Sequence, residues 1–81
     1  MNSFTKLLNI CGEEREVLFI PHSSGSRDHF DIEYNQEGGK MKFRMFKNEE
    51  RLWTIAAQVG IPDCLHETEL LLHDIIEEEI E

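Results

Sequence analysis

Three side chains near the C-terminal end have residue types and a spacing that can bind a divalent metal. His66, Glu69 and His73 are separated by three and four residues, so they follow one line along a helix. The two histidines are nevertheless two turns apart, roughly 10 Å along the axis at 1.5 Å per residue. Only one of them can share a metal with Glu69, and two ligands make a weak site. The sequence therefore offers a weak metal-site hypothesis, and surface histidines beside carboxylates are the plainer interpretation.

Other residues with reactive side chains form no recognisable catalytic pattern. His22 and His29 flank a polar loop and could lie close together, but no cysteine is near them in sequence. Cys11 and Cys64 lack CxxC spacing, which argues against a catalytic cysteine. Because no secretory signal is visible, we expect two reduced, partly buried thiols, with pairing in an oxidising compartment as the alternative. The segment HSSGS, residues 22–26, lacks the GxxxxGK[ST] spacing of a phosphate-binding loop. We expect no enzyme activity and no cofactor, because no base, nucleophile and oxyanion donor can be assembled.

Negative charge is concentrated in the last quarter of the chain. Residues 63–81 contain eight acidic residues and no Lys or Arg, whereas residues 1–62 contain nine acidic and eight basic residues. One interpretation is a solvated face that keeps a small protein soluble. The other is an anionic helix that binds a basic protein partner, with one leucine as its apolar contact. The candidate partner-binding residues, which share one outer arc of a helix, are Glu67, Leu70, Asp74, Glu77 and Glu78.

These side chains must be positioned by a small two-layer domain. The chain has 81 residues, 40% of them hydrophobic, which is enough for one core and predicts a single domain over residues 1–81. Apolar, β-branched and aromatic residues, in part alternating with polar ones, predict strands. Their expected ranges are 3–10, 15–21, 29–35 and 40–46, with a polar loop over residues 22–28.

Charge pairing between two of these strands explains a local run of basic residues. Four of the eight Lys and Arg residues lie between Lys40 and Lys47, opposite an acidic strand. A two-residue turn at Gly38-Gly39 would pair Glu33 with Arg44, whereas a four-residue loop would pair Glu33 with Lys42 and Asp31 with Arg44. In both registers acidic side chains meet basic ones, which helps to fix the register. We therefore expect the basic strand to be neutralised by its neighbour.

Residues 48–60 are ambiguous between a helix and a strand. Asn48 as N-cap and Gly60 as terminator would suit a helix. A turn followed by a strand over residues 52–58 would instead point Trp53, Ile55 and Ala57 inward. We favour the strand, because Trp53 then covers the sheet.

The last segment predicts a helix over about residues 63–79. Pro62 suits the start of a helix, and Asp63 lies in its first turn. An apolar stripe at helical spacing would pack on the sheet. Its members are Leu65, Leu71, Leu72, Ile75 and Ile76. The predicted fold is α+β, an antiparallel β-meander of four to five strands packed by one C-terminal helix.

The layout resembles small single-domain bacterial proteins with an N-terminal hairpin, a Phe-x-Ile strand, a Trp-containing strand and a Pro-initiated C-terminal helix. The matching stretches are FTKLLNI, REVLFIPH, HFDIEY, LWTI and IPDCLHETELLLHDII. The resemblance is one of pattern without a diagnostic motif. It implies an α+β fold and a bacterial cytosolic setting, and it implies no activity.

The sequence favours a protein-interaction or accessory module that presents the acidic helix. The alternative is a small-ligand or weak metal-binding domain that uses the helix His and Glu residues. Nucleic-acid binding is not expected, because an acidic helix would be repelled by phosphates. No apolar run is long enough to span a bilayer and no secretory signal is visible, so we expect no membrane association and a cytoplasmic location. The expected state is a monomer or a homodimer paired through an edge strand.

Overall fold

The computed structural model describes the backbone of residues 2–24, 27–58 and 60–80. Five antiparallel strands lie side by side in their sequence order, β1-β2-β3-β4-β5. Their bounds are β1 Phe4–Ile10, β2 Glu13–Ser24, β3 Arg27–Gln36, β4 Gly39–Lys47 and β5 Trp53–Ile55, and the helices are α1 Asp63–Glu67 and α2 Glu69–Ile80. The predicted α+β meander with C-terminal helical structure is confirmed.

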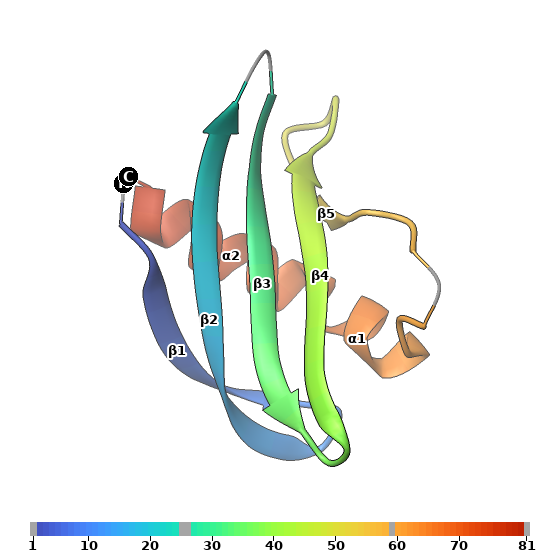
Figure 1. Ribbon diagram of the computed structural model, residues 1–81. Coiled ribbons are helices and arrows are strands. Elements are labelled where there is room, and N and C mark those ends of the chain that lie inside the picture. The colour runs from blue at the N-terminus through green and yellow to red at the C-terminus, as the bar shows by residue number, and fades with distance from the viewer. Residues whose placement is uncertain (1, 25–26, 59, 81) are drawn as a thin grey trace.

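The helix α2 crosses one face of the sheet (Figure 1). Alternate residues of each strand point to this face, because successive side chains of a strand point to opposite sides. They form one core cluster with the buried apolar residues of both helices. The buried residues are Ile10, Val17, Phe19, Phe30, Ile32, Tyr34, Phe43, Met45, Trp53, Ile55, Leu65, Leu72 and Ile76. The charged residues that alternate with them lie on the opposite face of the sheet, turned away from α2.

Strands β2 and β3 are longer than predicted. Residues 22–24 pair with residues 27–29 in register, so the predicted loop over 22–28 is wrong for these positions. Gly25 and Ser26, which complete that loop, lie outside the described residues. As a result His22 and His29 face each other across two paired strands instead of flanking a flexible connection.

The register of β3 and β4 follows the second of the two predicted alternatives. Asp31 lies opposite Arg44 and Glu33 opposite Lys42. Gln36 pairs with Gly39, so the turn consists of Glu37 and Gly38, and neither the turn at Gly38-Gly39 nor the four-residue loop of the second alternative is correct. Gly38 has a φ of 88°, a left-handed conformation that glycine adopts without a steric penalty.

The ambiguous segment after β4 is a turn and a short strand. The Asn48 side chain accepts hydrogen bonds from the backbone N–H groups of Glu50 and Leu52, both at 2.9 Å, so it caps a turn and not a helix. Strand β5 is confirmed but is shorter than the predicted 52–58, and Ala57 is exposed instead of pointing inward. Beyond β5 the Gln58 side chain still donates to the Lys42 carbonyl at 2.9 Å.

The C-terminal helix is divided instead of continuous. Thr68 separates α1 from α2, and its hydroxyl donates to the carbonyl of Cys64 at 3.0 Å. Such bonding to the residue four positions earlier competes with the helical pattern and often bends helices. Leu71, predicted to belong to the core stripe, is exposed, whereas Leu65, Leu72 and Ile76 are buried.

The two cysteines form a disulfide, so the expectation of two reduced thiols is wrong. Cys11 and Gly12 form the turn between β1 and β2, with φ values of 54° and 87°. Cys64 lies in α1, and the two Cα atoms are 5.3 Å apart. The disulfide therefore ties the first hairpin to the start of the helical segment, across a sequence separation of 53. Among the described residues, no helix is both long and apolar enough to cross a membrane.

Candidate functional site

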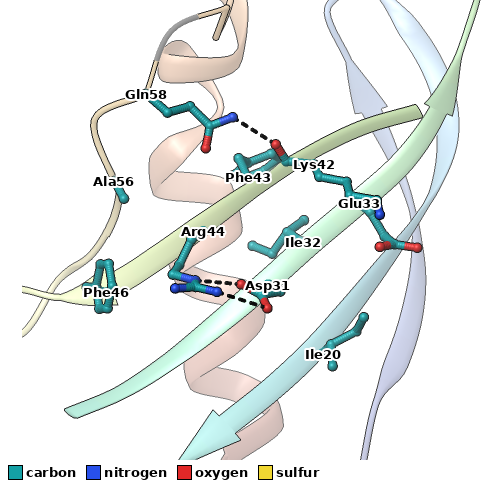
Figure 2. Close-up of a pocket in the computed structure, with 10 residues that line it drawn as sticks. All are labelled: Ile20, Asp31, Ile32, Glu33, Lys42, Phe43, Arg44, Phe46, Ala56 and Gln58. Carbon is teal, nitrogen blue, oxygen red and sulfur yellow. Dashed lines mark hydrogen bonds and ion pairs between the residues drawn. The ribbon is translucent and has the colours of Figure 1, made fainter. Parts of the chain in front are cut away.

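Oppositely charged side chains line a hollow of about 510 Å³ on the face of the sheet turned away from α2. Figure 2 shows Arg44 of β4 reaching Asp31 of β3 in this hollow, with an Nε to Oδ1 distance of 2.7 Å. The Glu33 carboxylate lies 3.2 Å from the Lys40 ammonium. Lys40 is two residues along β4 from Lys42, which is directly opposite Glu33. The acidic strand therefore meets the basic strand as predicted.

The pairing of Asp31 with Arg44 shifts the pKa values of the two side chains in opposite directions. The hydrogen bond from Arg44 holds the pKa of Asp31 below its usual value of 3.8, although partial burial acts against the effect. The same hydrogen bond raises the pKa of Arg44. Asp31 is consequently negatively charged at neutral pH. The basic side chains of β4 in this hollow lie beside acidic side chains of β3, so the hollow is not a positively charged surface.

Two histidines extend this face beyond Asp31. His22 and His29 are opposite each other in the β2–β3 register, and their rings stack with centroids 5.0 Å apart. His22 Nε2 lies 3.0 Å from Asp31 Oδ2. Both histidines also line a second cavity, of about 340 Å³, together with Pro21, Asp28, Phe30, Trp53 and Ile80. The sequence allowed His22 and His29 to be close across a loop, but the predicted loop did not include the strand register that aligns them.

Two of the three predicted helix metal ligands accept hydrogen bonds from the backbone of β5. Glu69 Oε2 accepts a hydrogen bond from the N–H of Ile55 at 2.9 Å, and His73 Nδ1 accepts one from the N–H of Trp53 at 3.0 Å. His66 is exposed on α1. In the described part of the chain, the group of three close metal-ligating side chains is elsewhere, at His22, His29 and Asp31. The metal hypothesis for His66, Glu69 and His73 stays a prediction, with two of its three ligand groups already engaged.

The acidic residues of the helical segment divide into two groups. Glu77 lies 3.4 Å from Lys47 of β4, and Glu79 lies 3.8 Å from Lys6 of β1. Glu67, Asp74 and Glu78 are exposed and make no ion pair within the described residues. Glu77, predicted to belong to the outward arc, is half-buried because it contacts the sheet.

Two exposed leucines lie among the outward carboxylates. Leu70 is 67% exposed and Leu71 is 44% exposed. At 100° per residue, Leu70, Leu71, Asp74 and Glu78 fall on the side of α2 opposite the buried Leu72 and Ile76. We call these four residues, together with the exposed Glu67 at the end of α1, the outer helix face.

Searches with protein-family models, against curated proteins and against solved structures found no match for this chain.

Proposed function

We propose that this chain is a small protein-interaction module that binds a basic partner through the outer helix face. The observation that carries the proposal is the pair of exposed leucines, Leu70 and Leu71, between carboxylates without a cation partner among the described residues. A surface that only maintains solubility needs the acids but does not need two neighbouring apolar side chains. An apolar centre with a charged rim is the usual composition of a protein-binding surface.

The unfavourable electrostatic energy of the acidic residues on α2 supports the same proposal. Asp74 and Glu78 are four residues apart on α2, a spacing at which like charges destabilise a helix by a few tenths of a kcal/mol. Glu78 also lies near the C-terminal end of α2, where the helix dipole disfavours negative charge. A basic partner would remove both penalties on binding.

The partner that fits this surface has complementary chemistry. Lys or Arg side chains would pair with Glu67, Asp74 and Glu78, and one or two apolar side chains would cover Leu70 and Leu71. Charge complementarity of this kind mainly accelerates association, and it weakens with rising salt concentration. An amphipathic basic helix meets these requirements.

Affinity purification from the source cells with three baits tests the proposal. The baits are the natural chain, the variant Glu67→Lys/Asp74→Lys/Glu78→Lys, and the charge-matched control Glu14→Lys/Glu37→Lys/Glu49→Lys. The control residues are exposed and distant in sequence from the outer helix face. A basic protein retained by the natural chain and the control, but lost from the first variant, supports the proposal. Equal recovery by all three baits, or equal loss from both variants, contradicts it.

The cellular location of the protein is also a prediction. The sequence favours the cytoplasm, whereas a disulfide favours an oxidising compartment, because cytosolic thiols are normally kept reduced. Alkylation of intact source cells followed by mass spectrometry separates these alternatives. Labelled Cys11 and Cys64 would support the cytoplasm, and unlabelled cysteines would support an oxidising compartment.

A further inference from the structure

Two imidazoles and one carboxylate converge on the face of the sheet turned away from α2. One ligand atom each from His22, His29 and Asp31 lies within 4.8 Å of the others. The three residues come from two adjacent strands: His22 of β2 is opposite His29 of β3, and Asp31 is two residues further along β3. Residues two apart in a strand share a face, so the pairing itself brings the three side chains together.

The partners of the ligand atoms distinguish this cluster from the predicted helix site, because Asp31 is held by side chains and not by the backbone. Arg44 Nε binds Oδ1 of Asp31, which leaves Oδ2 directed at His22 Nε2. Arg44 Nη2 also donates a longer hydrogen bond to Oδ2, at 3.4 Å, which a metal ion bound to Oδ2 would have to replace. A carboxylate ligand whose second oxygen is held by a hydrogen bond is the usual second-shell arrangement of protein metal sites. By contrast, Glu69 and His73 use the corresponding atoms to bind the backbone of β5.

We propose that His22, His29 and Asp31 bind a divalent transition metal of the kind that favours imidazole, such as Zn²⁺ or Ni²⁺, with the remaining coordination positions open. Two histidines and one carboxylate are a ligand set for such ions, and Mg²⁺ or Ca²⁺ would instead require oxygen ligands. Both cysteines are in the disulfide, so thiolate ligands are not available to compete.

A small movement of the three side chains toward one another would bring their ligand atoms to metal-binding distances. With metal–ligand distances of about 2.1 Å, ligand atoms in a tetrahedral site are roughly 3.4 Å apart. The His22–Asp31 pair already has a separation of 3.0 Å, so His29 makes the main adjustment, by rotation of its ring. Asp31 lines the hollow of about 510 Å³ and the histidines line the cavity of about 340 Å³, so water or an added ligand can reach the open positions.

The positive charge of Arg44 limits the affinity. The guanidinium already neutralises Asp31, and a bound metal must share that carboxylate. Glu33, on the same face, supplies a further negative charge, but it is paired with Lys40. The site therefore suits reversible binding more than a permanent structural metal.

Isothermal titration calorimetry with ZnCl₂ and NiCl₂, on the tag-free oxidised chain, tests the site. We expect one ion per chain and a Kd for His22→Gln at least about tenfold weaker, because even outer-shell partners contribute about 10–100-fold. His22 is exposed, so the variant should keep the thermal unfolding midpoint of the metal-free chain. His66→Gln, which removes another exposed histidine, is the matched control and should bind as the natural chain does.

Asp31→Asn provides a second variant that keeps the size of the side chain, and it too should weaken binding. Zinc-dependent NMR shifts of the natural chain should centre on residues 20–22 and 29–31. The absence of binding at a large molar excess of metal would overturn the proposal. So would loss of binding in His66→Gln with retention in His22→Gln.

Discussion

The carboxylate of Glu69 accepts a hydrogen bond from the backbone N–H of Ile55 at 2.9 Å and so closes part of an open sheet edge. One helical turn later, His73 accepts from the N–H of Trp53. Four residues of a helix rise about 6 Å, and two residues of a strand rise about 6.6 Å, so the two spacings match. Helix α2 therefore uses polar side chains to cover the edge of β5, which would otherwise be available to pair with another strand.

Glu69→Ala should destabilise the fold by about 1–3 kcal/mol, because the part-buried N–H of Ile55 would lose its acceptor. Glu69→Gln should lose less stability, since its amide oxygen can still accept the hydrogen bond from the Ile55 N–H. Urea unfolding monitored by Trp53 fluorescence measures both effects. Glu67→Ala is the control, as Glu67 is exposed and makes no ion pair within the described residues. Equal stabilities of Glu69→Ala and Glu67→Ala would show that the edge contact contributes nothing.

Reduction of the Cys11–Cys64 disulfide should lower the free energy of unfolding by about 4 kcal/mol in the chain-entropy account, given a sequence separation of 53. Urea unfolding with and without a reducing agent measures the change. Cys11→Ser/Cys64→Ser should behave as the reduced chain does and should no longer respond to the agent. An oxidised chain no more stable than the reduced one would contradict the prediction.

Glu78→Gln should stabilise the fold by roughly 0.2–0.5 kcal/mol, because it removes a like-charge neighbour of Asp74 and a negative charge near the C-terminal end of α2. Thermal unfolding at low salt measures the shift, and high salt should reduce it. Glu14→Gln on β2 removes the same charge elsewhere and serves as control. A less stable Glu78→Gln chain would mean that Glu78 has a structural role.

Tyr34 should make the stability of the fold depend on pH in the alkaline range. Burial raises its pKa above the ordinary value of 10.0, partly offset by the charge of Arg15, whose Cζ lies 5.7 Å from the ring centroid. The neutral phenol is therefore favoured in the folded chain. Its contribution to stability is complete below about pH 10 and is lost as pH rises through the folded-state pKa.

Phenolate absorbance measures this titration without interference from other tyrosines, because Tyr34 is the single tyrosine of the sequence. The folded chain should titrate at a higher pH than the same chain in urea. Coincident curves, or an earlier folded titration, would contradict the burial effect.

The strands were predictable where local patterns agreed with one another. In β3, apolar Phe30, Ile32 and Tyr34 alternate with polar residues, and β4 alternates in the same way, so both faces and both strands were correctly assigned. Charge alone could not choose the register, since both alternatives placed acids opposite bases. In the observed register Asp31 lies opposite Arg44, and the turn contains Gly38 with a φ of 88°.

The missed features depend on contacts between residues far apart in sequence. Cys11 and Cys64 are joined only because α1 returns to the first hairpin, although an even cysteine count was a signal for pairing. The helix is divided at Thr68, where the hydroxyl donates to the Cys64 carbonyl, and an apolar stripe does not reveal such a bond. His22, His29 and Asp31 meet through strand register; the polar segment between the histidines allowed those two to be close, but it did not indicate the register or the part of Asp31.

NMR mapping of a binding surface tests the proposed interaction most directly. The ¹⁵N-labelled chain is titrated with a helical peptide that has Lys on one side and Leu on the other. We expect saturable amide shifts confined to residues 67–78, weakened in Leu70→Ser/Leu71→Ser and absent in Glu67→Lys/Asp74→Lys/Glu78→Lys. Shifts centred on the charged face of the sheet around Asp31 and Arg44, or no saturable shifts, would contradict a role for the outer helix face.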